Sequence, residues 1–299
     1  MLNVQPLEKI QSIFEKYTTS YHFYLKDLRS GQEYELGVKK RYPICSCFKL
    51  AVLMAYFDSI KDPKELEVEV VIPPEKFSAG GGIVNYFTTP VKFTYLQLAQ
   101  MMMAFSDGTA TDILIERVGM DVVNAKLKKI SPLSNIASDV KSMVSNFRTH
   151  FDISKLKNTS ISPDFSHSFT DFTNAKDLSD LAESCMNYGK NENDLQAAFK
   201  SCFEVRKQLP RTSLFFSENL KTMGKGGSLG DVYFGNDCGV TIENNCPLFA
   251  FGICAYGFRF DKDINEILFG IIGLSILSFL GIEVEPNSRW TQKTGTLLE

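Results

Sequence analysis

Histidine and tryptophan are scarce in this sequence of 299 residues, which contains three histidines and one tryptophan. The histidines are scattered and the seven cysteines form no CxxC pair, so we expect no zinc site and no other cofactor. A basic stripe is also lacking and the net charge is −3, which argues against nucleic acid as a partner. The apolar fraction of 44% is nevertheless too high for a disordered chain.

The sequence also lacks a hydrophobic run long enough to span a bilayer. The most apolar stretch, residues 267–282, is too short and contains glycine, so it predicts a buried terminal helix and no membrane partner. The first 17 residues lack the apolar centre of a secretory signal and place Leu7, Ile10, Phe14 and Tyr17 near helical spacing. If Met1 is the natural start, we expect a cytoplasmic protein.

An odd number of cysteines without an export signal predicts that most thiols are reduced and buried. Cys238 and Cys246 flank the stretch GVTIENN, a predicted hairpin, and could face each other across it. The expected compartment argues against a disulfide there, so the sequence leaves the pairing open. The seven cysteines are at positions 45, 47, 185, 202, 238, 246 and 254.

Predicted strands occupy both ends of the chain and predicted helices the middle. Residues 20–37 alternate as in a strand hairpin, and strand character returns in 231–234, 239–243 and 248–256. Asp121 and Asn174 are candidate helix caps. The helical patterns cover 46–60, 94–105, 109–118, 121–130, 174–188 and 193–204.

These segments predict an α+β fold, in which one antiparallel sheet is built from both chain ends, flanked by helices, with an inserted all-helical lobe. We interpret residues 1–299 as a single two-lobed domain. The sheet lobe would comprise about 1–45 and 205–299, and the helical lobe about 46–204.

The stretch CSCFK at 45–49 places Ser46 three residues before Lys49 at the start of a predicted helix. Residues at this spacing share a helical face, so the lysine can act as base for the serine if burial or another cation lowers its pKa. Taken alone, the pair also fits a helix-start serine and a surface lysine. Cys45 and Cys47 are alternative nucleophiles, but we interpret both as packing residues because Cys47 lies off the face of Lys49 and Cys45 precedes the helix.

Two further stretches follow this pair in order. Ser106-Asp107-Gly108 begins 60 residues after Ser46, and a Lys-Gly-Gly-Ser stretch at 225–228 precedes the late strands. The three are similar to the S-x-x-K, S-D-N and K-T-G motifs of class A β-lactamases and penicillin-binding proteins. From about residue 21 to the C-terminal helix the chain resembles class A β-lactamases, which implies their fold. A literal KTG at 293–295 has no strand after it, and we assign it to the tail.

The resemblance implies a chemical role for four side chains. Ser46 would attack a carbonyl and become acylated, and Lys49 would serve as base or proton shuttle. Ser106 would pass a proton to the leaving group. Lys225 would help to keep Lys49 neutral and would attract an anionic substrate.

The resemblance also implies a substrate-binding surface made largely of backbone. The N–H groups of Ser46 and Ser228 would form the oxyanion hole. Gly226 and Gly227 would let the strand edge approach the substrate closely. Asp107 and Gly108 of the second motif would belong to the same surface, and residues 80–87 would form a rim of the cleft.

The chain departs from the family pattern at three points. Gly108 replaces an asparagine, and Gly226 replaces a threonine whose hydroxyl would bind a β-lactam carboxylate. Between residues 148 and 171 no deacylating glutamate is evident. The titratable groups there that could activate a water are Asp152, His150, Asp164 and His167, although a cap, turn or surface role suits each of them better.

We therefore expect a serine hydrolase or transacylase that acts on an ester or amide carbonyl of a small-molecule acyl substrate and turns over β-lactams poorly. An acyl acceptor would be the second partner of a transacylase. A β-lactamase with an unusual deacylation base and a non-catalytic ligand-binding relative are the alternatives. The sequence determines neither the acyl substrate nor the oligomeric state.

Overall fold

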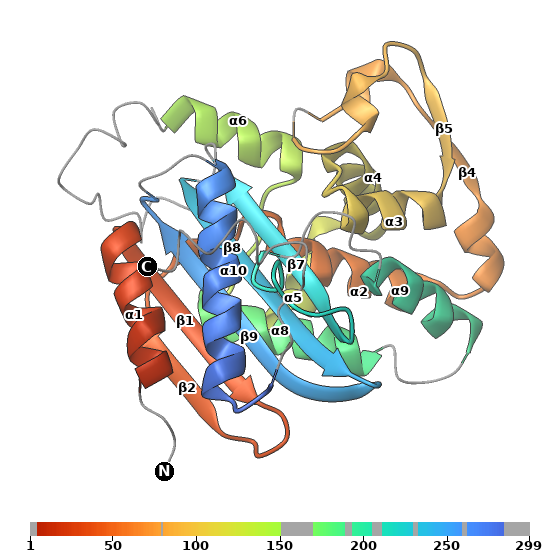
Figure 1. Cartoon of the computed structure of the whole chain (residues 1–299). Coiled ribbons are helices and arrows are strands. Elements are labelled where there is room, and N and C mark those ends of the chain that lie inside the picture. The colour runs from red at the N-terminus through yellow and green to blue at the C-terminus, as the bar shows by residue number, and fades with distance from the viewer. Residues whose placement is uncertain are drawn as a thin grey trace.

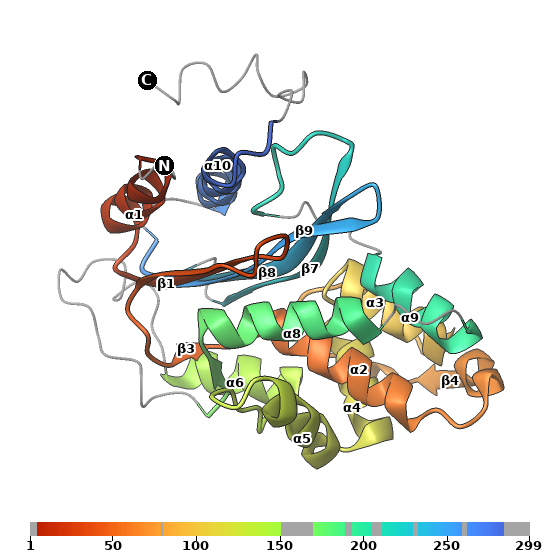
Figure 2. The same ribbon diagram turned by 90° about the horizontal axis from the view of Figure 1, so that it is seen from below.

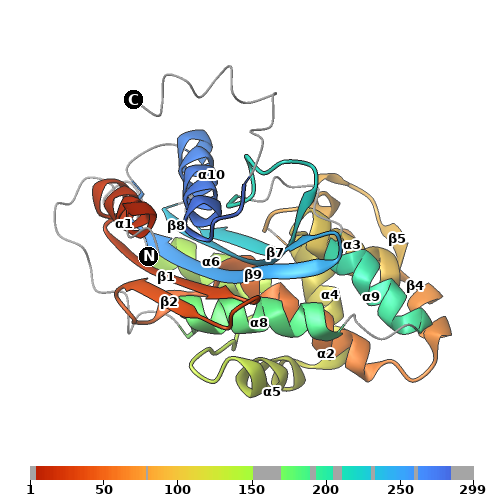
Figure 3. The same cartoon turned by 60° about the horizontal axis from the view of Figure 1, so that its bottom comes forward.

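The computed structural model describes residues 5–78, 80–150, 170–188, 193–204, 211–229, 233–258 and 262–283. Its centre is a five-stranded antiparallel sheet (Figure 1). The terminal helices α1 (Gln5–Tyr17) and α10 (Lys262–Phe279) pack together on one face of this sheet (Figure 2). Helix α8 (Ala175–Tyr188) lies along the opposite face of the sheet (Figure 3).

The sheet joins the two ends of the chain. Its strands are β1 (Ser20–Asp27), β2 (Glu33–Gly37), β7 (Leu220–Leu229), β8 (Phe234–Glu243) and β9 (Cys246–Tyr256), in the spatial order β2-β1-β9-β8-β7. N-terminal β1 pairs with C-terminal β9, with Phe23 opposite Ile253. The predicted fold class, with a sheet from both chain ends and helices between them in sequence, is therefore confirmed. The lobe boundaries near 45 and 205 stay a prediction.

Helices cover both faces of the sheet, so both faces are buried. Successive side chains of a strand point to opposite faces and therefore enter two different clusters. In β1, Phe23 and Leu25 join the cluster under α1 and α10, while Tyr24 joins the larger cluster on the helical side. In β9, Phe251 and Cys254 divide in the same way. Strand β9 consequently has a nearly continuous apolar sequence, whereas the equally buried β8 also carries Asn236 and Asp237.

The hairpin between β8 and β9 turns at Asn244 and Asn245, both with positive φ, as a two-residue hairpin turn requires. Cys238 lies opposite Gly252 and is buried, whereas Cys246 lies opposite Glu243 and is exposed. The two cysteines therefore do not face each other. All seven cysteines are free thiols.

The helices of the middle of the chain form the second layer. They are α2 (Lys49–Ser59), α3 (Tyr95–Ala104), α4 (Gly108–Val118), α5 (Met120–Ile130), α6 (Val140–His150) and α9 (Asp194–Glu204). Each predicted helix is present within a few residues. Asn174 caps α8 as predicted, because its side chain accepts a hydrogen bond from Asp177 N at 3.0 Å. The cap predicted at Asp121 is wrong, since Gly119 is the N-cap of α5 and Asp121 lies in its first turn.

Several short elements were not predicted. Strand β3 (Tyr42–Pro43) pairs with β6 (Phe172–Thr173), and β4 (Glu69–Ile72) pairs with β5 (Val91–Thr94). Short 3₁₀ turns are η1 (Cys45–Phe48), η2 (Pro63–Glu67), η3 (Pro74–Lys76) and η4 (Val84–Tyr86). Strand β8 begins at Phe234, the last residue of the strand predicted at 231–234; Tyr233 is in a turn, and residues 231–232 lie outside the described residues.

The apolar stretch near the C-terminus forms α10, as predicted, and packs Phe269, Ile272 and Ile276 against the sheet. In the part of the chain that the structure describes, no helix has the length and apolarity needed to cross a membrane.

Candidate active site

Ser46 and Lys49 lie at the junction between η1 and α2. Ser46 belongs to the 3₁₀ turn, and Lys49 is the first residue of the α-helix. The α-helix therefore begins three residues later than the predicted start at residue 46. A 3₁₀ turn has three residues per turn, which aligns side chains three positions apart. The Nζ atom of Lys49 lies 3.3 Å from Ser46 Oγ. Cys45, just before the serine, has a left-handed backbone with φ of 51°, a conformation that often accompanies a functional site in non-glycine residues.

Lys49 is the most deeply buried cation of this region, with 1% of its surface exposed. Its Nζ donates to the carbonyl oxygen of Ser106 at 2.6 Å and to Ser106 Oγ at 3.0 Å. Burial, reinforced by the positive charge of Lys225, lowers the pKa of Lys49 to about 7. A large fraction of this amine is therefore neutral at physiological pH.

Ser106 lies in the turn between α3 and α4 and has a φ of 55°. This left-handed backbone places both its carbonyl oxygen and its hydroxyl within hydrogen-bond distance of Lys49. The first two motifs, 60 residues apart in the sequence, thus meet at the Nζ atom of Lys49, which contacts both Ser46 and Ser106.

Asp107 is buried and uses both carboxylate oxygens on backbone N–H groups. Oδ1 accepts from Ala110 N at 2.9 Å, which caps α4, and Oδ2 accepts from Ile83 N and Val84 N at 2.7 and 2.9 Å. Gly108 N in turn donates to Gly81 O at 2.8 Å. The second motif therefore anchors the stretch 80–87 against the site, and the geometry gives Asp107 a positioning role.

The third motif lies on the edge strand β7, which passes directly over η1. A Cβ atom at Gly227 would lie 2.6 Å from Ser46 N and 2.7 Å from Cys45 Cβ, so only glycine allows this approach. The contact brings the peptide that links Gly227 to Ser228 close to the backbone N–H of Ser46. Lys225, 4% exposed, donates from Nζ to Gly226 O at 2.8 Å, and its charge acts on Lys49 as described above.

Two buried polar residues that the sequence did not single out support this strand. Arg211 donates from Nη1 to Gly227 O at 3.0 Å and to Asn236 O at 3.2 Å, and its Nε pairs with Glu266 at 3.2 Å. Asn236 donates from Nδ2 to Pro43 O at 2.7 Å, which ties β8 to the segment that leads into Ser46. Neither residue belongs to a motif, and the backbone contacts that define their roles exist only in the folded chain.

The thiols around Ser46 point into the protein core. Cys47 and Cys238 each donate from Sγ to Lys225 O at 3.3 Å, and both are fully buried. Burial raises the pKa of the Cys45 thiol far above its usual value, which disfavours the reactive thiolate. This geometry supports the interpretation of Cys45 and Cys47 as packing residues.

The two glycines that depart from the family motifs lie where little space is left. A Cβ at Gly108 would lie 3.0 Å from both Ser78 Oγ and Val140 Cγ1. A Cβ at Gly226 would lie 3.3 Å from Asp237 Oδ1 and 3.4 Å from Arg211 Nε. Neighbouring side chains thus occupy the space that an asparagine or a threonine would need.

The candidate deacylation bases fall outside what the structure describes. Asp152, Asp164 and His167 lie in the undescribed stretch 151–169, and His150 ends α6 with an undescribed side chain. Asp171, which follows this stretch, accepts from Ala137 N and Ser138 N at 2.6 and 3.0 Å and so anchors the backbone there. The literal KTG at 293–295 also lies outside the described residues.

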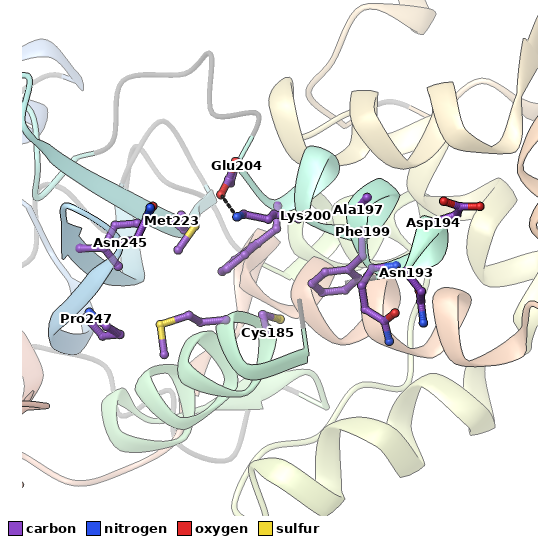
Figure 4. Close-up of a pocket in the computed structure, with 14 residues that line it drawn as sticks. Cys185, Asn193, Asp194, Ala197, Phe199, Lys200, Glu204, Met223, Asn245 and Pro247 are labelled. Atoms are coloured by element: carbon purple, nitrogen blue, oxygen red, sulfur yellow. Dashed lines mark hydrogen bonds and ion pairs between the residues drawn. The ribbon is translucent and has the colours of Figure 1, made fainter. Parts of the chain in front are cut away.

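A cavity of about 590 Å³ lies elsewhere, between α8, α9 and the turn end of the β8–β9 hairpin (Figure 4). Met223 of β7 contributes to its wall, but none of the predicted site residues does. Within the described ranges, no group of three or more histidine, cysteine or acidic side chains is arranged to hold a metal ion.

The fold is that of class A β-lactamases. The β-lactamase from Sphaerobacter thermophilus superposes with a TM-score of 0.76 at 16% identity, over 95% of this chain and 99% of that one. A class A β-lactamase from Bacteroides cellulosilyticus gives 0.73 at 14% identity, over 94% and 98%. PBP-A gives 0.68 at 16% identity, over 92% and 96%.

A family model described as "Beta-lactamase enzyme family" matches residues 5–280. The chain therefore belongs to this family, which confirms the resemblance seen in its motifs. No curated protein sequence gives a significant match.

Proposed function

We propose that this protein is a serine hydrolase or transacylase that forms an acyl-enzyme on Ser46 with an ester or amide carbonyl. One observation carries the proposal: the buried Lys49 amine lies 3.3 Å from Ser46 Oγ and 3.0 Å from Ser106 Oγ, with a pKa lowered to about 7. A neutral amine at this distance can take the serine proton, which a lysine of ordinary pKa could not do at neutral pH. Its cytoplasmic location stays a prediction.

In the proposed reaction, Ser46 Oγ attacks the substrate carbonyl while its proton passes to the neutral Lys49 amine. The backbone N–H groups of Ser46 and Ser228 stabilise the oxyanion of the tetrahedral intermediate. The proton then moves from Lys49 through the hydroxyl of Ser106 to the leaving group, along the 3.0 Å contact between them. Collapse of the intermediate expels the leaving group and leaves an ester on Ser46.

Deacylation is where we expect this protein to differ from its β-lactamase relatives. The stretch 149–170 contains no glutamate, and the carboxylate of Asp171 is bound to backbone N–H groups. We propose that a β-lactam acyl-enzyme is therefore long-lived. A less hindered acyl group would leave to water or to an acyl acceptor, which gives esterase or transacylase activity.

A second candidate function is that of a true β-lactamase with an unusual deacylation base. The family match over residues 5–280 favours it. A variant of PBP-A has been captured as an acyl-enzyme with penicillin G, so acylation by a β-lactam is compatible with this fold. Steady-state nitrocefin hydrolysis separates the two: sustained rapid turnover supports the β-lactamase, and a single burst followed by slow turnover supports our proposal.

Intact-protein mass spectrometry tests the nucleophile directly. The wild type, Ser46→Ala and Cys47→Ala would be exposed to a fluorophosphonate, penicillin G and p-nitrophenyl acetate. We expect adducts that disappear only in Ser46→Ala, because Cys47 is a buried neighbour with the same sequence surroundings. Absence of any adduct in the wild type would favour a ligand-binding protein, and loss only in Cys47→Ala would identify a thiol enzyme.

A further inference from the structure

A second concave site is lined in part by residues 39–41, which precede the segment that leads into Ser46. Its volume is about 420 Å³. The lining comes from three places in the chain: the run 39–41, the end of α5 with the turn that follows, and β6 with the start of α8. None of the motif residues belongs to it.

The charge of this cavity is of one sign. Its described lining contains four cations, Lys39, Lys40, Arg41 and Lys128, and no acidic residue. Asn174, which lines the cavity, caps the N-terminus of α8, a helix of 14 residues, so the positive end of the helix dipole lies beside the cavity. The first N–H group of the helix, that of Ala175, already donates to His22 Nδ1 at 3.0 Å. Two acidic residues are close in sequence to the lining residues Phe172 and Asn174, and both carboxylates have partners. Asp171 accepts from two backbone N–H groups, and Asp177 accepts from the hydroxyl of Ser134 at 2.7 Å.

Two of the four cations have ordinary partners. Lys39 lies 3.5 Å from Glu35, and Lys40 donates to the hydroxyl of Tyr256 at 2.8 Å. Among the described residues, Arg41 and Lys128 make no hydrogen bond or ion pair. Arg41 stacks on the ring of Phe172 at 4.2 Å, which fixes the plane of its guanidinium and leaves its N–H groups available.

A buried polar group also points to a ligand. Asn174 lines the cavity and is 3% exposed. Its Oδ1 caps α8, but its Nδ2 makes no hydrogen bond within the described part of the chain. An amide donor of a largely buried residue, beside two cations that make no hydrogen bond or ion pair with the described residues, is suited to donate to an oxyanion held in the cavity.

We propose that this cavity binds a small polyanion, a molecule with two or more phosphate or carboxylate groups. Arg41 and Lys128 would hold separate anionic groups, and Asn174 would donate to one of them. The site is five residues from Ser46 along the chain, and β3 and the hydrogen bond from Ile44 N to Asp171 O connect the two. The inference does not depend on the proposed acyl-transfer function.

Isothermal titration calorimetry of the full chain tests this, with pyrophosphate and citrate as probes at constant ionic strength. We expect saturable binding of one probe per chain, and the preferred probe tells phosphate from carboxylate ligands. Arg41→Gln and Lys128→Gln should each weaken binding by about tenfold, because each removes charge-assisted hydrogen bonds. Lys129→Gln is the matched control: it removes the same charge from the next residue, which is exposed and does not line the cavity, and should change affinity by less than about twofold.

Two results would overturn the proposal. One is the absence of saturable binding of either probe to the wild type. The other is an equal loss of affinity in Lys129→Gln and Lys128→Gln, which would indicate unspecific attraction to a basic surface. Hydrogen exchange of the wild type gives a readout that needs no variant: bound probe should slow exchange in residues 39–44 and in the first turn of α8, and unchanged exchange there would also reject the site.

Discussion

The two halves of the candidate active site are held in different ways. On the helical side, the Nζ atom of Lys49 contacts the side chains of Ser46 and Ser106 at 3.3 and 3.0 Å. On the sheet side, β7 contributes mainly backbone, and the nearby side chain of Arg211 binds that backbone from behind. We infer that a substitution in the helical half removes a reactive side chain. A substitution in the sheet half instead shifts the β7 backbone, whose N–H and carbonyl groups are still there.

The largest effect is expected in the helical half, from Lys49→Met. This change removes the proposed base and should slow acylation by p-nitrophenyl acetate on the order of 10³-fold. The wild-type acylation rate should rise as the pH passes through about 7, because deprotonation of Lys49 creates the base. The variant should lack this inflection. Rates measured between about pH 5.5 and 8.5 check both points, with Lys129→Met as a control on the surface. An unchanged inflection in Lys49→Met would show that another group is the base.

The next largest effect is expected in the sheet half, from Arg211→Lys. The guanidinium binds the carbonyl of the same peptide whose N–H, on Ser228, belongs to the proposed oxyanion hole. Lysine keeps the charge but cannot bond Gly227 O, Asn236 O and Glu266 together. Acylation should slow by about 10- to 100-fold, below the loss for deleting a donor outright.

A comparison of kcat with KM separates positioning from folding for Arg211. A displaced oxyanion peptide lowers kcat while KM for the ester changes little. Arg117→Lys, at an exposed arginine paired with Glu65, is the matched control and should leave both constants unchanged. A rise in KM with constant kcat would instead place Arg211 in substrate binding.

The same contrast explains which parts of the site the sequence could reveal. Ser46, Lys49 and Ser106 were found because their chemistry depends on residue type at a fixed spacing, and the structure brings them together. Arg211 and Asn236 were missed because they act on carbonyl oxygens, which every residue has. Asp107 was expected in the substrate-binding surface, and only the folded loop shows its oxygens bonded to backbone N–H groups.

The fold was predictable for a related reason. Long strands and helices carry a periodic pattern, and the position of strands at both chain ends requires β1 to pair with a late strand. Two-residue strands such as β3 and β6 are too short to show any period. The cysteine pair 238 and 246 was left open because hairpin register, which sets Cys238 opposite Gly252, depends on the turn.

Burial of Lys49 in the helical half should also lower the free energy of unfolding of the wild type. The folded-state pKa of Lys49 lies below its unfolded value, so the folded state binds this proton less tightly. The resulting destabilisation is complete below about pH 7 and disappears as the pH rises toward the unfolded pKa near 10.5. Lys49→Met should therefore raise the free energy of unfolding by about 2 kcal/mol at neutral pH, after allowance for the lost bonds to Ser106.

Urea unfolding of both proteins at several pH values measures this gain. The difference between variant and wild type should shrink as the pH increases above 7, since the wild type loses its penalty. A variant that is less stable than the wild type at every pH would mean that the hydrogen bonds of Lys49 outweigh its burial.

The smallest effect is expected from restoring a family residue in the helical half, at the start of α4. Gly108→Asn would place Cβ 3.0 Å from Ser78 Oγ and Val140 Cγ1, so the neighbours must move and stability should fall by about 1 kcal/mol. Gly81→Asn is the matched control in the adjoining loop, because a Cβ there meets only Ser106 O at an ordinary 3.8 Å. Nitrocefin turnover should not improve in Gly108→Asn, since the new amide would point toward Ser78 and Val140 and deacylation would be unchanged. Improved turnover with unchanged thermal stability would show that the glycine, rather than the absent glutamate, limits β-lactam hydrolysis.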